Sequence, residues 1–323
     1  MIKKLLYKLR SGKNCKFIYY LVNNLRQLQP KFIFRSRLAS TLASLEQRKD
    51  KEYIMERVNY YNKLQPLVKL PSSAPMLSEH KVRGAKVYFY DTYEYIRWFS
   101  PSFHWGFCPG DVVFVPEYPS VVKSRPLCEG NENSILLKLD KIRHFIFVKD
   151  NKKFTDKKDL VIFRGKVVGK ESRVRFMEKY FSHPMCDLGD VSRSNDVPAE
   201  WKTEKKTIRE HLDYKFIMAL EGNDVASNLK WVMSSNSLAV MPRPTCETWF
   251  MEGKLIPNYH YVEIKPDYSD LEERVNYYIA HPDEAQKIID HAHEWVSQFR
   301  DKKREKLISL LVMDKYFRAT GQK

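Results

Sequence analysis

The feature that most constrains how this chain folds is an alternation of short β-rich runs with helical patterns, which begins after Pro75. Runs of β-branched and aromatic residues predict strands at Val87–Tyr90, Asp111–Val115, His144–Lys149, Leu160–Phe163, Phe216–Leu220, Leu238–Met241 and Tyr261–Ile264. Helical spacing predicts helices at Ser134–Ile142, Ser172–Phe181, Ser227–Ser234 and Glu247–Gly253. Because strands that alternate with helices form crossover units, we expect an α/β fold with mainly parallel sheets.

Helical segments flank the alternating region. Apolar residues at helical spacing predict a helix within residues 41–65, and a breaker-rich loop follows at residues 70–75. Ser269 and Glu272 have the spacing of a capping box, and Pro282 begins a further helix with one apolar stripe. A length of 323 residues suggests two domains, and the polar run Lys149–Asp159 is the best candidate for a hinge between them.

Positive charge is concentrated at the start of the chain. Lys and Arg number 56 against 40 Asp and Glu, a formal net charge of +16, and residues 1–40 hold ten of the basic residues and no acid. Leu, Ile, Phe and Tyr are interleaved with these charges. The pattern fits an amphipathic element on an anionic membrane surface, a segment that binds nucleic acid, or a solvated basic helical face. The residues leave these three interpretations open.

The N-terminus resembles neither a secretory signal nor a membrane span, because its short apolar runs are interrupted by Lys8, Arg10, Lys13 and Lys16. Five scattered cysteines without a CxxC pair fit a reducing compartment better than a disulfide framework or a zinc cluster. We therefore expect a cytoplasmic protein.

Several common catalytic signatures are absent. Residues 165–170 (GKVVGK) are one residue short of a P-loop, and Glu171 stands where Ser or Thr would hold magnesium. The chain also has no GxGxxG, HExxH or GxSxG, which removes a dinucleotide fingerprint and the commonest hydrolase motifs. A sugar or lipid kinase would need a magnesium and ATP site that the sequence does not offer.

Polar clusters remain where predicted strands end, which is where open α/β sheets bind ligands. They lie at residues 115–119, 163–175, 221–231 and 242–247. A strand–turn–helix junction exposes backbone N–H groups to an anion, and the guanidinium groups of Arg164 and Arg173 suit phosphate oxygens. For any single cluster, the alternative is an ordinary solvated turn.

Taken together and in order, these clusters resemble glycosyltransferase family 90, and its bacterial lipopolysaccharide branch fits best. The resemblance covers roughly residues 85–300 and is most specific from Phe163 to Asp267. It is carried by VPEYP at 115–119, the KSRP…NSILLKLDKIRHF segment at 123–145, FRG at 163–165, YKFIMALEGND at 214–224, SNSLAV at 235–240 and TWFMEGKLIPNYHYVEIKPD at 248–267.

The resemblance implies a GT-B fold, in which two Rossmann-like domains face each other across a cleft. It predicts a basic helical N-terminal region at 1–70, an acceptor domain at 71–150, a UDP-sugar-binding domain at 151–300, and a C-terminal helix at 301–323 that packs back on the N-terminal domain. It also implies UDP-sugar donors, inversion at the anomeric carbon and no metal. The lack of any DxD, the usual metal-binding motif of sugar-nucleotide enzymes, agrees with this last expectation.

The resemblance also assigns site residues. Glu117 matches the family's catalytic Asp, and Arg164, Gly165 and Arg173 match its donor-diphosphate residues. Where relatives often have an Arg, this chain has Asn228, so we expect Lys230 or Arg243 to help neutralise the leaving group. The expected donor-nucleotide set is Arg164, Gly165, Ser172, Arg173, Gly222, Asn223, Ser227, Asn228, Lys230, Arg243 and Glu247.

Two of these assignments have simple chemical reasons. Glu117 would take the proton from the acceptor hydroxyl, while positive side chains and helix N-terminal amides stabilise the departing UDP. Glu247 either holds ribose or sugar hydroxyls or is only a favourable first-turn acid.

The predicted function is metal-independent, inverting transfer of a sugar from a UDP-sugar to a hydroxyl of a lipopolysaccharide core or related surface glycan. Its predicted location is cytoplasmic and peripheral to the anionic inner membrane, through residues 1–40, with no nucleic-acid partner. The alternative is a non-catalytic basic module that binds nucleic acid or anionic membrane.

Overall fold

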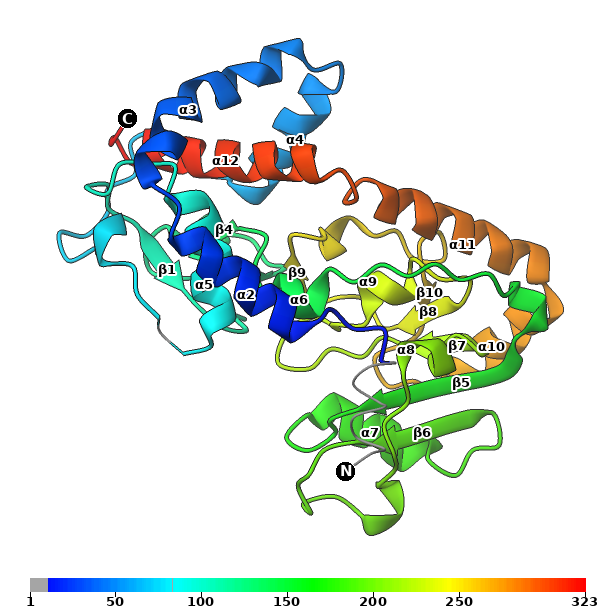
Figure 1. Ribbon diagram of the computed structural model, residues 1–323. Helices are drawn as coiled ribbons and strands as arrows, with labels where there is room; N and C mark the ends of the chain where they lie inside the picture. Colours follow the sequence, from blue (N-terminus) through cyan, green and yellow to red (C-terminus); the bar gives the residue numbers. More distant parts are fainter. Residues whose placement is uncertain (1–10, 83) are drawn as a thin grey trace. The chain divides into compact units, whose positions relative to one another are not determined.

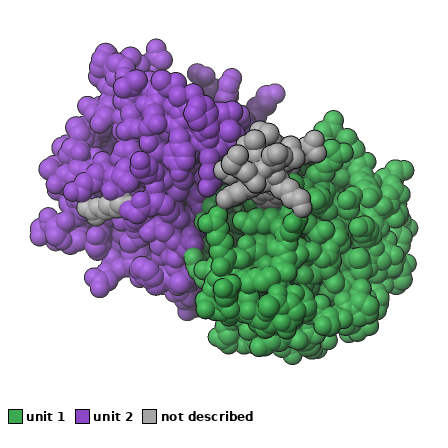
Figure 2. All heavy atoms as spheres, turned by 60° about the horizontal axis from the view of Figure 1, so that its bottom comes forward, with its two compact units in different colours: residues 1–14, 143–244, 254–298 green, residues 15–142, 245–253, 299–323 purple. Residues whose placement is uncertain are grey.

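The computed structural model describes residues 11–82 and 84–323, which fall into two compact units (Figure 2). Unit 1 comprises the described part of Met1–Asn14 together with Arg143–Pro244 and Lys254–Gln298. Unit 2 comprises Cys15–Ile142, Thr245–Gly253 and Phe299–Lys323. The short helix α6 (Lys141–His144) and the 3-10 turn η5 (Glu252–Lys254) lie where the chain passes from one unit to the other.

Unit 1 is built on a five-stranded, entirely parallel sheet in the order β10-β8-β7-β5-β6 (Figure 1). Its strands are β5 (Lys158–Gly165), β6 (Cys186–Asp190), β7 (Tyr214–Met218), β8 (Leu238–Met241) and β10 (Val262–Glu263). Every residue of β7 and β8 is buried, as expected for central strands covered on both faces.

The helices of unit 1 surround this sheet. They are η3 (Phe154–Asp156), α7 (Glu171–Tyr180), η4 (Ala199–Trp201), α8 (Ile208–His211), α9 (Leu229–Val232), α10 (Leu271–Ala280) and α11 (Pro282–Ser297). Helix α11 starts with Pro282 in its first turn, followed by acidic residues that favour the positive end of the helix dipole.

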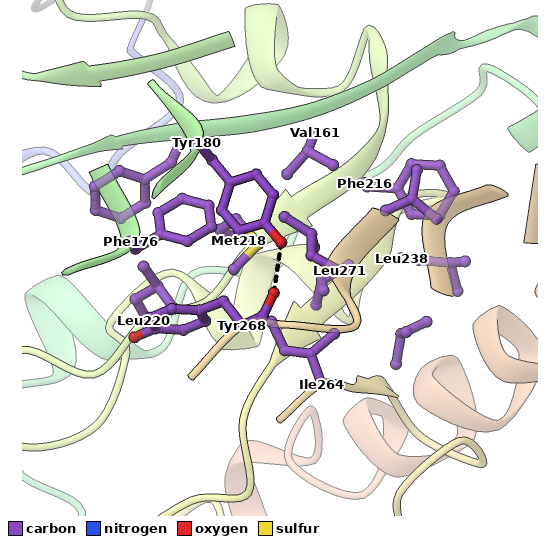
Figure 3. Close-up of a cluster of buried hydrophobic side chains, with 14 of the residues drawn as sticks. Val161, Phe176, Tyr180, Phe216, Met218, Leu220, Leu238, Ile264, Tyr268 and Leu271 are labelled. Atoms are coloured by element: carbon purple, nitrogen blue, oxygen red, sulfur yellow. Dashed lines mark hydrogen bonds between the residues drawn. The ribbon is translucent and has the colours of Figure 1, made fainter. Parts of the chain in front are cut away.

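The core of unit 1 joins the sheet to helices α7, α10 and α11 (Figure 3). Phe176 of α7 packs edge-to-face on Tyr268, which precedes α10, and the Tyr180 hydroxyl donates to the Tyr268 carbonyl at 2.6 Å. These contacts fix α7 against the turn before α10.

Unit 2 contains two small sheets and the longer helices at both ends of the described chain. Strands β1 (Gly106–Cys108), β2 (Ser120–Val122) and β4 (Ser134–Leu136) form a parallel sheet, and β3 (Ser124–Pro126) pairs antiparallel with β9 (Cys246–Thr248). The helical elements are α2 (Lys16–Gln27), α3 (Lys31–Ala43), η1 (Ser44–Gln47), α4 (Lys51–Tyr61), η2 (Leu77–Glu79), α5 (Lys86–Ile96) and α12 (Lys302–Ala319).

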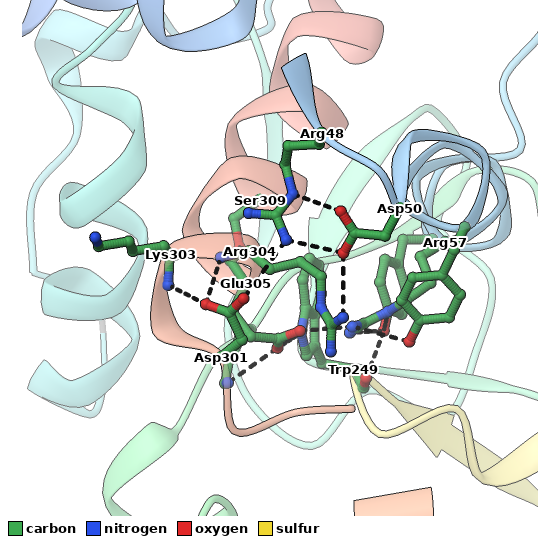
Figure 4. A network of polar contacts seen from close by, with 12 residues as sticks. Arg48, Asp50, Arg57, Trp249, Asp301, Lys303, Arg304, Glu305 and Ser309 are labelled. Carbon is green, nitrogen blue, oxygen red and sulfur yellow. Dashed lines mark hydrogen bonds and ion pairs between the residues drawn. The ribbon is translucent and has the colours of Figure 1, made fainter. Parts of the chain in front are cut away.

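A buried polar network joins α12 to three distant segments of unit 2 (Figure 4). Glu305 of α12 accepts from Arg57 of α4 at 2.6 Å and from the Trp249 indole at 2.6 Å, and it pairs with Lys138 at 3.0 Å. Helix α12 itself begins where the Asp301 side chain accepts the N–H groups of the first turn. The last helix is therefore tied to α4 by a desolvated charge cluster.

The expected α/β class with parallel sheets is confirmed, and so are four predicted strands. Leu160–Phe163 lies within β5, Phe216–Leu220 overlaps β7, Leu238–Met241 is β8, and Tyr261–Ile264 contains β10. The helices expected around α4, α7, α9, α10 and α11 are also present.

Three strand predictions were wrong. Val87–Tyr90 lies in helix α5, Asp111–Val115 is irregular, and His144–Lys149 is irregular after the end of α6. Helix α5 buries aromatic side chains on most of its circumference, so a run with high β-propensity is overridden by tertiary packing.

Two helix predictions and two boundary signals were also wrong. Ser134–Ile142 begins as strand β4, and Glu247–Gly253 begins in strand β9. Ser269 does not cap α10, whose N-cap is Asp270. The run Lys149–Asp159 is not a hinge but part of unit 1, where Asp150 binds the Lys157 ammonium at 2.7 Å.

Among residues 11–82 and 84–323, no helix is both long enough and apolar enough to cross a bilayer.

Candidate functional site

The strand order of unit 1 creates a switch point between β5 and β7. From β5 the chain crosses to β6 on one side, and it then returns past β5 to form β7, β8 and β10 on the other. In doubly wound sheets, the connections after the two strands at such a point leave in opposite directions and open a crevice at the carboxyl edge. The residues that follow β5 and β7 are therefore the candidate ligand-binding segments.

The segment after β5 is held by a carboxylate that the sequence analysis missed. Asp190, at the end of β6, is fully buried and accepts the Val167 N–H at 2.9 Å. Burial favours the neutral form of the Asp190 carboxyl, but hydrogen bonds from Lys202 and Ser192 outweigh it. The pKa of Asp190 is therefore lowered, and the group stays ionised. Gly169, with a φ of +68°, then turns the chain into α7.

Arg173, in the first turn of α7, lies at this switch point. Its Nη1 donates to the Lys166 carbonyl after β5 at 2.9 Å. Its Nη2 and Nε donate to the carbonyls of Leu220 and Glu221 after β7, at 2.7 and 2.9 Å. A guanidinium has five N–H donors, so two remain after these three bonds.

The charge of Arg173 is not balanced by a carboxylate. It forms no ion pair with any residue of the described chain, and its guanidinium lies over the Phe163 ring at 5.6 Å. Burial lowers the pKa of Arg173 to about 10, which still leaves it charged at neutral pH. A half-buried cation that has no carboxylate partner and two N–H groups left over suits an anion.

The turn after β7 is shaped around this arginine. A Cβ on Gly222 would lie 3.0 Å from Nη2 of Arg173, so glycine permits the close approach. The Asn228 amide donates to the Met218 carbonyl at 2.9 Å and closes the turn, and Lys170 donates to the side chain of Asn223. The switch point thus gathers four of the predicted donor residues: Arg173, Gly222, Asn223 and Asn228.

Arg164 also lies at the end of β5, but its side chain bonds to β6 rather than to the residues after β7. It is bonded to the side chain and the carbonyl of Asp187 on β6, and it is only 7% exposed. The Tyr214 hydroxyl also donates to Asp187. The charge of Arg164 is therefore balanced within the sheet, and it stabilises the β5–β6 pair.

The other predicted donor residues of unit 1 occupy varied places. The Ser172 carbonyl accepts the Tyr268 hydroxyl at 2.9 Å, Ser227 is exposed, and Lys230 is fully buried in α9. Gly165 ends β5, where a Cβ would come within 2.6 Å of the Phe163 ring. Arg243 is 72% exposed and pairs with Glu263 at 3.0 Å.

Two predicted site residues belong to unit 2. Glu247 is in strand β9, not at the start of a helix, and it forms a fully buried pair with Arg125 at 2.8 Å while accepting the Tyr60 hydroxyl. Glu117 is an exposed residue of the turn that leads into β2, and Asn133 donates to its carbonyl at 3.1 Å. The segment before Glu117 is irregular, so this residue precedes a strand rather than following one.

No group of three or more His, Cys, Asp or Glu side chains within the described ranges is arranged to hold a metal ion.

Comparison with known proteins identifies the chemistry. The model of the family described as "Glycosyl transferase family 90" matches residues 136–311, which is more than half of the chain. The chain is also 42% identical, over 265 residues, to a protein named O-glucosyltransferase LpsA from Dichelobacter nodosus, with 82% of each chain covered. The family match contains the whole switch point of unit 1.

Proposed function

The chain belongs to glycosyl transferase family 90, and from this premise we propose that it transfers a sugar from a UDP-sugar to a hydroxyl of a lipopolysaccharide core or related surface glycan. Membership of a transferase family sets aside the alternative of a non-catalytic basic module. Because the similar protein is named an O-glucosyltransferase, UDP-glucose is the first donor to test.

One observation carries the donor-site proposal: Arg173 presents an unbalanced positive charge at the switch point between β5 and β7. In our proposal the donor diphosphate accepts the two remaining N–H groups of Arg173, with Lys166 and Lys170 close by in sequence on the same loop. Fixed positive side chains would then take up the charge that develops on the departing UDP, without a metal ion. Arg164 would act by holding β5 against β6.

Glu117 is the proposed base of an inverting reaction. Its carboxylate would accept the proton of the acceptor hydroxyl as the oxygen attacks the anomeric carbon and the bond to UDP breaks. An exposed turn leaves the carboxylate accessible to an acceptor, and the resemblance of residues 115–119 to the family's catalytic motif supports the role. The GT-B arrangement, with unit 2 as the acceptor domain and unit 1 as the donor domain, is part of the same proposal.

We also propose that the protein works at the cytoplasmic face of the inner membrane, attracted by the basic residues of 1–40. Four of the ten, Lys3, Lys4, Lys8 and Arg10, lie outside the described residues.

The test is a comparison of Glu117→Gln with Glu129→Gln, since Glu129 is another exposed turn glutamate of unit 2. We expect Glu117→Gln to lower kcat by ~10²–10⁴-fold and to keep the affinity for UDP, while Glu129→Gln matches the wild type. Sugar transfer and UDP binding are measured with a panel of UDP- and GDP-sugars, with and without EDTA. Unchanged turnover in Glu117→Gln would overturn its role as base; strict loss of activity with EDTA, or a preference for GDP-sugars, would overturn the proposed donor site.

A further inference from the structure

Helix α2 of unit 2 presents its apolar side to solvent. Phe17 is 74% exposed, Leu25 54% and Leu28, the C-cap residue, 79%. At 100° per residue, the exposed apolar side chains fall within an arc of roughly 140°. They are Phe17, Ile18, Leu21, Val22, Leu25 and Leu28, which we call the α2 apolar face.

The opposite side of α2 is polar and is held against α5 (Figure 1). The Tyr19 hydroxyl donates to buried Asp91 at 2.7 Å, and Arg26 pairs with Glu94 at 2.8 Å. Although burial alone would raise it, the charges of Lys141 and Arg26 lower the pKa of Glu94 to about 2, so the pair stays ionised. These contacts fix the rotation of the helix.

The orientation of α2 is thus the reverse of that of an ordinary surface helix, whose apolar stripe faces the core. Turning the apolar face inward would break the contacts to Asp91 and Glu94. The helix is therefore built to keep this face outward, and six exposed apolar side chains on one side of a helix mark a binding surface.

The charges around α2 indicate what kind of partner the α2 apolar face binds. Within residues 11–45, every charged side chain is basic, and the first acid of the chain is Glu46. Lys16, Lys31, Arg35 and Arg37 of unit 2 are exposed and form no ion pair with a described residue. Pairing with a second copy of α2 would bring like charges together, whereas the phosphates of an anionic bilayer would neutralise them.

We propose that α2 lies in the plane of an anionic bilayer surface, with its apolar face among the acyl chains near the headgroups and the flanking basic side chains on lipid phosphates. This inference rests on the proposed membrane location and specifies the surface that contacts the lipid. Basic side chains alone would hold the protein at the lipid phosphates without inserting it. In this proposal the α2 apolar face also inserts into the bilayer surface and anchors the protein there.

The experiment measures co-sedimentation of the full chain with phosphatidylcholine vesicles that contain or lack phosphatidylglycerol. We expect the wild type to bind the phosphatidylglycerol vesicles, and Leu21→Gln/Leu25→Gln to bind at least ~10-fold more weakly without any change in charge. The matched control is Leu67→Gln/Ile256→Gln, because these two side chains are 82% and 54% exposed but lie outside α2. This control should bind like the wild type.

Two outcomes would overturn the inference. One is equal vesicle binding by both double variants. The other is a lipid-free dimer, seen by light scattering, that Leu21→Gln/Leu25→Gln converts to a monomer while the wild type does not bind vesicles. Hydrolysis of UDP-glucose, assayed without lipid, should be the same in all three proteins. If the wild type lacks it although vesicle binding follows the expected pattern, the proposed donor fails and the membrane surface stands.

Discussion

At the carboxyl edge of the parallel sheet, Arg173 is fixed by three carbonyl groups and still keeps two N–H donors. The carbonyls follow the ends of two different strands, β5 and β7. The position of the guanidinium therefore depends on how these two strand ends lie next to each other at the switch point. Gly222 adds to this, because any side chain there would press on the guanidinium. A lysine would keep the charge but lose the planar, multiply bonded group.

We therefore expect Arg173→Lys to weaken UDP binding by roughly 10- to 100-fold, which corresponds to the loss of one or two charge-assisted hydrogen bonds. The matched control is Arg175→Lys, two residues along the same helix, where the arginine is 57% exposed and pairs with Glu171. Isothermal titration with UDP measures both. Equal affinities in the two variants would contradict the role of Arg173.

Residue chemistry predicted part of this site. The sequence singled out Arg173 and the turn 221–231, because basic and small residues follow a strong strand signal there. It missed Asp190, since the CDLGD run of β6 has few residues that favour strands. It could not reveal the pairing of Arg164 with Asp187 or of Glu247 with Arg125, because each partner lies on a separate strand.

At the scale of elements, the turn before β10 depends on one neutral histidine. Nδ1 of His260 accepts the Ile256 N–H at 2.9 Å, and its ring lies against Trp295 of α11 at 5.0 Å between centroids. Burial, aided by nearby His291, lowers the pKa of His260 to about 4. Between pH 4 and about pH 6.5 the unfolded chain therefore binds a proton that the folded chain does not.

Stability consequently falls as the pH falls through this window. We expect a change from pH 7 to pH 5 to remove roughly 1–2 kcal/mol of the free energy of unfolding through His260 alone. In His260→Gln this contribution should disappear, while the exposed-site variant His281→Gln should keep it. Urea titrations at the two pH values measure the difference. The same pH dependence in His260→Gln and the wild type would contradict the assignment.

Four strands of unit 1 were predictable from their apolar runs, whereas the three-residue strands of unit 2 were not. The apolar run Leu238–Met241 coincides with β8 because a buried parallel strand is a continuous apolar segment. Strands β1, β2 and β4 have three residues each, too few for a periodicity to appear. Their positions depend on parallel pairing with one another, which is a property of the fold.

At the scale of the whole molecule, each unit is assembled from separate stretches of the chain. Thr245–Gly253 belongs to unit 2 although its sequence neighbours on both sides belong to unit 1. The pairing of β9 with β3, in which Glu247 is opposite Arg125, accounts for this. No local sequence pattern reveals a partner more than a hundred residues away, and the boundary expected at 150/151 differs from the structural division at 142/143.

The Glu305 network links α4, the Trp249 segment and α12 within unit 2. Glu305→Gln would leave Arg57 and Lys138 without the carboxylate that faces them both, so we expect a loss of about 3–5 kcal/mol in the free energy of unfolding. Glu46→Gln is the control, because Glu46 and Lys51 form an exposed pair, and it should cost less than about 1 kcal/mol. Chemical denaturation followed by circular dichroism measures both. A small loss in Glu305→Gln would show that the cluster is dispensable.

Because α12 completes unit 2, the order of synthesis on the ribosome matters. Unit 1 has all of its described strands once translation has passed Gln298. At that point α4 still lacks its packing partner α12, and Arg57 lacks the Glu305 carboxylate. Until α12 is made, the part of unit 2 that will cover Leu310, Val312 and Tyr316 is exposed to water or to a chaperone. A nascent chain therefore carries an incomplete unit 2 until α12 has been made, and we expect a chain that stops just before α12 to be degraded faster than one that includes it.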